Sequence, residues 1–159
     1  MNHKIIKTDW KTHQHQLMDI RIRVFMQEQA VNESDEWDGL DDQATHFLVV
    51  TTDEKANDFA IGCARLLNEH NEQGAPRFHV GRVALLEPYR GCGIGSQLMA
   101  FIIQHCRAAA SEREIYLHAQ TERQGFYQRL GFITRGEEFM DAGIPHITMY
   151  FHPEGNQNG

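Results

Sequence analysis

Three glycines at alternate positions, Gly91, Gly93 and Gly95, lie between an apolar run and a segment with a helical pattern. Glycine has no Cβ, so a backbone of this composition bends tightly and leaves its N–H groups open to a ligand. The helix that follows presents the positive end of its dipole at the same corner. Free backbone N–H groups at a helix N-terminus bind anions, phosphate above all. The stretch from Arg90 to Ser96 is therefore predicted to bind a phosphate group.

Two common phosphate loops do not fit this turn. A nucleoside-triphosphate loop has four residues between its glycines and then Lys before Ser or Thr. This turn ends Gly95-Ser96-Gln97, which excludes such a loop. A dinucleotide loop has G-x-G-x-x-G spacing and an acidic residue about 20 positions later at a strand end. Here the spacing is G-x-G-x-G, and Glu112 and Glu114, the acids at that distance, precede the next strand.

The run from Arg90 to Gly95 resembles the (Q/R)-x-x-G-x-(G/A) pyrophosphate loop of the GNAT superfamily of N-acetyltransferases, which bind acetyl-coenzyme A. A second run, Gly125 to Phe132, resembles the F-Y-x-x-x-G-F segment of the same family and follows at the expected distance. A narrower resemblance, to the ElaA/YjcF subgroup of bacterial acetyltransferases, is carried by five further runs. They are Arg23 to Gln29, Glu36 to Asp41, Ala44 to His46, Leu117 to Gln120 and Gly143 to His146.

The resemblance implies that acetyl-coenzyme A is the acetyl donor, and the spacing of the histidines and cysteines predicts no metal site. The coenzyme contacts would come from the strand before the turn, the turn itself and the segment around the second motif. These residues are Val83, Ala84, Leu85, Arg90, Gly91, Cys92, Gly93, Ile94, Gly95, Ser96, Gln120 and Phe126. Cys92 takes a variable position of the loop, and the sequence shows no neighbouring base that would make its thiol a nucleophile.

Acetyl transfer to an amine needs a group that protonates the departing thiolate. The family uses the tyrosine of the second motif, which corresponds to Tyr127 here. A phenol with a pKa near about 10 stays protonated at neutral pH and suits this role. The alternative interpretation is that Tyr127 packs in the core beside Phe126.

The attacking amine must also lose a proton, directly or through water, because alkylamines have pKa values near about 10. The candidate bases are Glu28, Glu36, Asp38, His118 and His146, with Glu28 as the first choice. The subgroup resemblance and nearby aromatic residues imply a set of acceptor-site residues. They are Phe25, Gln29, Trp37, Asp38, His46, His118 and His146. For each of these histidines, a buried and hydrogen-bonded structural role remains the alternative.

Six acidic residues and no basic residue lie between Asn32 and Asp42. A charge block of this kind is usually a solvated loop. The alternative is a negatively charged funnel that attracts a cationic amine substrate. The sequence leaves both interpretations open.

Hydrophobic spacing predicts the elements that position these residues. Strands are expected at 3–9, 44–52, 59–67, 78–86, 114–120, 132–137 and 144–152, helices at 13–29, 95–110 and 123–130, and a polar loop at 68–76. This order predicts an α/β (α+β) fold. The resemblance specifies it as the GNAT acyl-CoA N-acyltransferase fold, a mixed central sheet of about seven strands flanked by about four helices.

The length of 159 residues predicts a single domain at 1–152, followed by a flexible tail at 153–159. The net charge of −7 argues against a nucleic-acid partner. No apolar run has the length of a membrane span, and no signal-peptide core is present, so we expect no membrane partner and a cytoplasmic location. The three cysteines lack C-x-x-C spacing, and the histidines lack metal-ligand spacing.

We therefore expect an N-acetyltransferase that moves the acetyl group of acetyl-coenzyme A to a primary amine of a small molecule or peptide, by direct attack in a ternary complex. A homodimer is one expectation, because many relatives of this size pair. Two alternatives remain open. An acyl-homoserine-lactone synthase shares the fold and an R-x-x-x-F helix, which Arg21 to Phe25 matches. A non-catalytic sensor of acetyl-coenzyme A would keep the fold without the chemistry.

Overall fold

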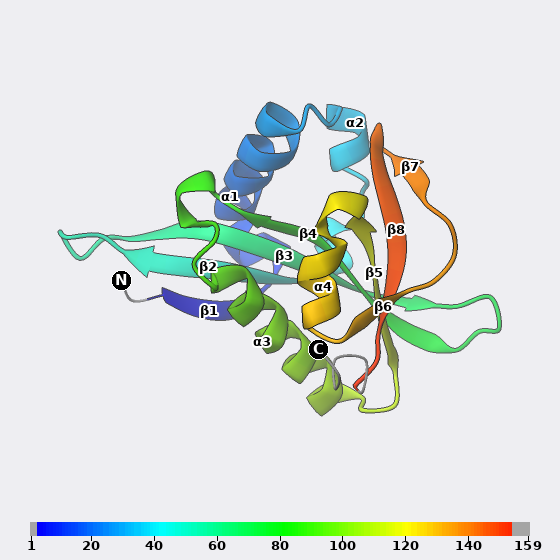
Figure 1. The fold of residues 1–159 in the computed structure, drawn as a ribbon. Coiled ribbons are helices and arrows are strands. Elements are labelled where there is room, and N and C mark those ends of the chain that lie inside the picture. Colours follow the sequence, from blue (N-terminus) through cyan, green and yellow to red (C-terminus); the bar gives the residue numbers. More distant parts are fainter. Residues whose placement is uncertain (1–2, 154–159) are drawn as a thin grey trace.

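One mixed sheet organises the chain in the computed structural model, which describes residues 3–153 (Figure 1). Its strands are β1 (His3–Thr8), β2 (Thr45–Thr52), β3 (Asp58–His70), β4 (Pro76–Leu85), β5 (Glu114–Gln120), β6 (Phe132–Thr134), β7 (Phe139–Asp141) and β8 (Ile144–Phe151). They lie in the order β1-β2-β3-β4-β5-β8-β6, with β7 also paired to β8. Only β4 and β5 pair in parallel within the described strands. The predicted mixed sheet flanked by helices is confirmed.

Helices cover both faces of this sheet. On one face lie α1 (Trp10–Arg21), its π-helical continuation (Ile22–Glu28) and the short α2 (Glu33–Glu36). On the other face lie α3 (Ile94–Ala109) and α4 (Gln124–Arg129) (Figure 1). Short 3₁₀ turns occupy Asp41–Gln43, Glu87–Tyr89 and Thr121–Arg123.

Each face of the sheet has its own hydrophobic core. The apolar stripe of α3, which includes Leu98 and Ile102, packs against strand residues such as Val80 and Leu117. Across the sheet, Leu17, Ile20 and Val24 of the first helix pack against Leu48, Cys63 and Ala84. Because each buried aliphatic side chain stabilises the fold by about 1.5–3 kcal/mol, both helical layers are held firmly on the sheet.

Several boundaries differ from the sequence prediction. The first helix begins at Trp10, before residue 13, because Asp9 caps it by accepting a hydrogen bond of 2.8 Å from the Thr12 N–H. The loop predicted at 68–76 is shorter, since β3 continues to His70 before it turns. A third strand, β7, lies between the two strands predicted near the C-terminus. Of the predicted tail at 153–159, residues 154–159 lie outside the described residues.

The sheet splits between β4 and β5. Their parallel pairing runs from Arg77 and Glu114 to Val80 and Leu117, and no pairing follows in the described strands. Just beyond Val80, the register of β4 against β3 is irregular, and Arg82 adopts a left-handed conformation with φ of 52°. The two strands therefore separate toward their C-terminal ends and open a gap through the middle of the sheet.

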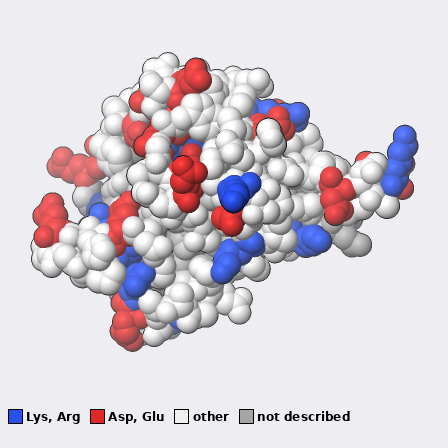
Figure 2. All heavy atoms as spheres, turned by 180° about the vertical axis from the view of Figure 1, so that it is seen from behind, with Lys and Arg blue, Asp and Glu red and all other residues white. Residues whose placement is uncertain are grey.

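The charged side chains are mixed by sign over the surface that Figure 2 shows, which is the molecule seen from behind. Acidic and basic groups lie side by side there, and neither sign covers that face. In the described part of the chain, no helix combines the length and the apolar character needed to cross a membrane.

Candidate active site

A cavity of about 450 Å³ fills the gap between β4 and β5. One part of its wall comes from the glycine turn, the start of α3 and α4, and the other part comes from the end of the first helix, β3 and the turn before β8. Cavities of several hundred Å³ with a few converging polar groups are the usual form of small-molecule sites. The gap in the sheet therefore connects both faces of the molecule through one continuous site.

The glycine turn has the geometry of an anion-binding corner. Gly91 and Gly93 have φ values of 78° and 90°, which side chains other than glycine rarely adopt, and α3 begins directly after Gly93. A Cβ at either position would meet no atom within 4 Å, so the space in front of the turn is open. Ser96 and Gly95 also line the cavity. Open backbone N–H groups at a helix N-terminus are what a phosphate requires.

The side chains of two residues in the turn point away from the cavity, although their backbone N–H groups remain part of the turn. The Cys92 thiol is exposed and donates a hydrogen bond of 3.2 Å to the Tyr89 carbonyl oxygen. Ile94 is buried in the core on the α3 side. Neither residue is among the described residues that line the cavity, whereas Val83, Ala84 and Leu85 are.

Arg90 connects the turn to the first helix. Its Nε–H donates to the Leu85 carbonyl oxygen at 2.9 Å, and Nη2 donates to both carboxylate oxygens of Glu28, at 3.0 and 2.9 Å. Glu28, the first-choice base, is therefore held in an ion pair and is not among the described cavity residues. Arg90 itself lines the cavity. This ion pair fixes the end of the π-helical segment against the end of β4.

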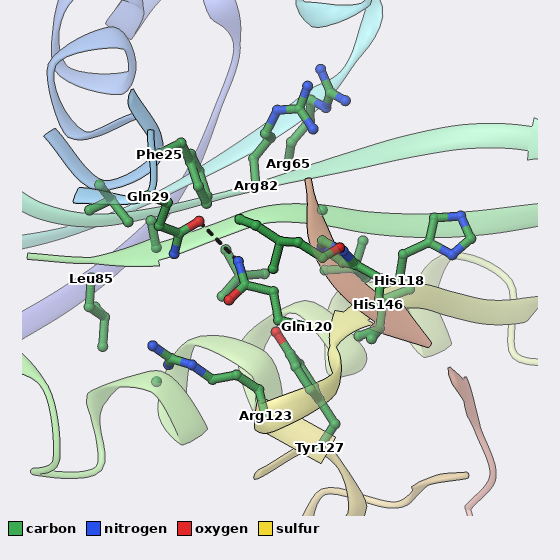
Figure 3. A pocket seen from close by; sticks show the side chains of 18 of the residues that line it. Phe25, Gln29, Arg65, Arg82, Leu85, His118, Gln120, Arg123, Tyr127 and His146 are labelled. Carbon is green, nitrogen blue, oxygen red and sulfur yellow. Dashed lines mark hydrogen bonds between the residues drawn. The ribbon is translucent and has the colours of Figure 1, made fainter. Parts of the chain in front are cut away.

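Tyr127 lines the cavity from α4. Its ring packs edge-on against Phe126, at 5.0 Å between centroids, and against Phe132, at 5.9 Å. Figure 3 shows its hydroxyl pointing up from α4 toward Gln120. Burial raises the pKa of Tyr127 to about 12, so the phenol stays protonated at neutral pH. The ring packs as the core interpretation expects, while the hydroxyl faces the cavity as the general-acid interpretation requires.

A pair of amides crosses the cavity. Gln120, at the end of β5, donates a hydrogen bond from Nε2 to Oε1 of Gln29 at 3.0 Å (Figure 3). Phe25 lines the same wall as Gln29. The amide pair therefore joins the first helix to the strand beyond the gap.

Histidines line the far end of the cavity. His118 places Nδ1 3.1 Å from the Thr148 hydroxyl, and His146 places Nδ1 2.7 Å from the carbonyl oxygen of Ile144. Burial lowers the pKa of His118, with His79 as the next cause. Neutral imidazoles can both donate and accept hydrogen bonds, so this end of the cavity suits a polar ligand.

The acidic stretch divides into two sets: Glu33, Asp35 and Asp42 are exposed, whereas Glu36, Asp38 and Asp41 bind arginines. The Arg21 side chain, 1% exposed, donates to Glu36 at 2.6 Å and to Asp41 at 2.7 Å. Arg65 binds Asp38 at 2.8 Å and Asp41 at 3.1 Å. Buried carboxylates require such partners because an unpaired buried charge is costly. Arginines therefore balance the charges of Glu36, Asp38 and Asp41, and Asp35 and Glu36 also line the cavity.

Arg82 completes this cluster from the irregular part of β4. Its guanidinium lies 3.0 Å from Glu36 and 3.3 Å from Asp38. Burial alone would raise the pKa of Asp38. Hydrogen bonds from Arg65 and the Leu40 N–H, together with the charges of Arg65 and Arg82, outweigh burial and lower this pKa to about 2. Three arginines thus face three carboxylates, which we call the arginine–carboxylate cluster: Arg21, Arg65, Arg82, Glu36, Asp38 and Asp41.

Of the predicted acceptor-site residues, Asp38 belongs to this cluster, and Trp37 and His46 lie beside it. The Trp37 ring lies 4.9 Å from the guanidinium carbon of Arg21. His46 is 1% exposed, and its Nε2–H donates to the Asp41 carbonyl oxygen at 3.0 Å. Burial lowers the pKa of His46. Trp37, Asp38 and His46 are not among the described cavity residues, and their contacts fix the acidic loop on the sheet.

Comparison with known proteins identifies the family of this fold and cavity. The family model described as Acetyltransferase (GNAT) domain matches residues 11–152. The chain belongs to the GNAT family. It is 34% identical to the uncharacterized protein YyaT of Bacillus subtilis over 152 residues, 94% of each chain. It is also 34% identical to protein ElaA of Escherichia coli over 134 residues, 84% of this chain and 83% of ElaA.

Solved structures agree with this assignment. The crystal structure of E. coli ElaA matches with a TM-score of 0.81 at 29% identity, over 95% of this chain and all of ElaA. That of an acyl-CoA N-acyltransferase from Pseudomonas aeruginosa matches with a TM-score of 0.79 at 27% identity, over 95% of this chain and 100% of that chain. Within the GNAT family, the chain therefore falls in the ElaA-like subgroup.

Sequence reasoning missed several cavity residues of this GNAT domain. Arg123 lines the cavity, and Figure 3 shows its side chain reaching from the turn just before α4 across toward α3. His79, Arg65 and Arg82 also line the cavity from β3 and β4. The available signal for His79 was its place between two buried apolar residues, Phe78 and Val80. The positions of Arg65 and Arg82 depend on the irregular register between β3 and β4, which no local sequence pattern predicts.

Proposed function

We propose that this GNAT domain is an N-acetyltransferase that moves the acetyl group of acetyl-coenzyme A to a primary amine of a small molecule or peptide. The observation that carries this proposal is the single cavity through the gap in the sheet. Its wall includes an open glycine turn on one face and a polar end with histidines on the other. A donor and an acceptor that enter from opposite faces can therefore meet inside one site, as direct attack in a ternary complex requires.

The glycine turn supports the donor part of the proposal. N–H groups from Gly91 to Ser96 and the N-terminus of α3 are suited to the pyrophosphate of coenzyme A. Arg123 adds a positive charge across the turn, where a phosphate would lie. The end of β4, from Val83 to Leu85, still pairs with β3 but no longer with β5, so its backbone groups on the side of the gap are available for the amide groups of the pantetheine arm.

Tyr127 supports the chemical part. When the amine nitrogen bonds to the thioester carbonyl carbon, the carbon–sulfur bond breaks and the sulfur needs a proton. The Tyr127 phenol, with its pKa near 12 and its hydroxyl in the cavity, remains protonated and can donate that proton.

The test is thiol release from acetyl-coenzyme A in the presence of spermidine, glucosamine or a lysine-containing tripeptide. Tyr127→Phe should lower kcat by about 100-fold or more while the dissociation constant of acetyl-coenzyme A stays nearly unchanged. Tyr150→Phe is the matched control, because Tyr150 lies on β8 and is not among the described cavity residues. Equal turnover of Tyr127→Phe and the wild type would refute the general-acid role. Tight coenzyme binding without turnover of any amine would favour a sensor.

A further inference from the structure

Glu69 and His79 form a carboxylate–imidazole pair at the point where the sheet splits. Glu69 Oε2 lies 2.8 Å from Nδ1 of His79, across the turn between β3 and β4. His79 lines the cavity and directly precedes Val80, the last residue of β4 that pairs with β5. The pair therefore lies where a donor and an acceptor from opposite faces would meet.

The pair fixes which nitrogen of His79 carries the proton. An ionised carboxylate only accepts hydrogen bonds, so Nδ1 must be the protonated nitrogen. Glu69 is held by the Tyr116 hydroxyl, which donates to its other oxygen, and by Arg77 at 3.7 Å. No contact to Nε2 of His79 is found among the described residues, which leaves its lone pair available. Carboxylates that orient catalytic histidines in this way are a common device in enzymes.

The charged and titratable groups around His79 come from both neighbouring strands. Glu69 and Arg65 face it from β3, Arg77 from its own strand, and Tyr116 and His118 from β5. Burial lowers the pKa of His79, against the opposite effect of Glu69. The His118 ring lies edge-on to the His79 ring at 5.0 Å between centroids. At neutral pH the imidazole is therefore uncharged and able to accept a proton.

The other candidate bases lack this arrangement. Glu28 is engaged by Arg90, and Glu36 and Asp38 belong to the arginine–carboxylate cluster. His118 and His146 line the cavity, but their Nδ1 atoms face a hydroxyl and a carbonyl oxygen rather than a carboxylate. A negative partner increases the basicity of an imidazole, and neutral partners do so much less.

We propose that His79 is the general base of the transfer and that Glu69 is its positioning residue. The inference rests on the proposed acetyltransferase function. The acceptor arrives as an ammonium ion, and Nε2 of His79 takes one proton from it, directly or through one water. The free amine then bonds to the thioester carbon and the carbon–sulfur bond breaks. Tyr127 protonates the sulfur and becomes a phenolate. The nitrogen of the new amide then gives one proton back to Tyr127. The proton that His79 accepted leaves to solvent.

The first experiment measures kcat and KM of the best amine of the panel against pH. His79→Gln should lower kcat at pH 7 by about 10²- to 10⁴-fold, with unchanged binding of acetyl-coenzyme A. The loss should shrink as the pH approaches about 10, where the amine is already deprotonated in water. His15→Gln is the matched control, because His15 is exposed on α1. A loss that is the same at every pH, or no loss, would overturn the assignment.

Glu69→Gln tests the positioning role. It should lower kcat by about 10- to 100-fold and move the acidic limb of kcat to lower pH, because His79 loses its negative partner. A merely structural role of Glu69 would leave the limb in place, and that result would overturn the positioning role.

A second measurement keeps the proposal testable when no amine of the panel turns over. Nitrogen-15 spectra of the wild-type imidazoles at pH 7.5, assigned with His79→Gln, should show His79 with a protonated Nδ1 and a bare Nε2. A protonated Nε2 would overturn the proposal. Failure of the protein to bind acetyl-coenzyme A would instead refute the proposed function, whatever the state of His79.

Discussion

Replacing Arg21 by Met should destabilise the protein strongly. The guanidinium is 1% exposed and binds Glu36 at 2.6 Å and Asp41 at 2.7 Å. Three arginines balance three carboxylates in the arginine–carboxylate cluster, so Arg21→Met leaves one buried negative charge without compensation. Breaking a buried ion pair on one side typically costs about 3–5 kcal/mol. For a domain of this size, that lowers the unfolding midpoint by about 6–20 °C.

The assay is urea unfolding of the variant beside a matched control on the same helix. Arg23 also pairs with an acid, Asp19, at 3.4 Å, but both side chains are more than half exposed. Arg23→Met should therefore cost about 0.5 kcal/mol or less. Adding Glu36→Gln to Arg21→Met restores the charge balance and should recover about 1 kcal/mol or more. A cost below about 1 kcal/mol for Arg21→Met, or an equal cost for Arg23→Met, would refute the reasoning.

Three further outcomes follow from the same structure. Gly93→Ala should cost about 1–2 kcal/mol in urea unfolding, because φ of 90° strains a Cβ, whereas Gly81→Ala, with open space and no positive φ, should cost little. The pKa of Asp38 is lowered from 3.8 to about 2, so its charged form favours the folded state above pH 4, and this stabilisation is lost as the pH falls toward 2. Because its side chain is 28% exposed, solvent screening limits the contribution to about 1 kcal/mol or less. The free energy of unfolding should therefore depend less on pH in that range for Asp38→Asn than for the wild type. An equal pH dependence would contradict this. Because burial raises the pKa of Tyr127 to about 12, kcat should show no alkaline loss from its ionisation below about pH 11. A Tyr127-dependent fall near pH 10 would contradict this raised pKa.

The parts of the site that the sequence predicted depend on local patterns. Alternate glycines before a helix specify the turn at Gly91 and Gly93, and the short motif around Tyr127 specifies its place on α4. Alternation within Glu114–Gln120 predicted β5 with its bounds. In each case the residues that determine the geometry are neighbours in the chain.

The remaining features depend on contacts between distant segments. Arg21 meets Glu36 and Asp41 only because the acidic loop folds back over the first helix, so composition alone suggested a free negative surface. Glu69 meets His79 because His79 lies opposite Leu67 in the β3–β4 register, which places Glu69 on the adjacent diagonal. Predicting that pair requires the register of the β3–β4 hairpin. The sequence prediction placed Glu69 in a polar loop at 68–76 rather than in β3, so it gave no such register.

The most direct test of the acetyltransferase assignment is thermal unfolding of the protein with saturating acetyl-coenzyme A, coenzyme A, ATP or NAD, each against buffer. At about 100 times its dissociation constant, a ligand stabilises the folded state by about 2.7 kcal/mol. For a domain near this size, that raises the midpoint by about 5–10 °C. A rise with acetyl-coenzyme A and coenzyme A alone is the predicted result, and no rise with either would contradict the donor site at the glycine turn.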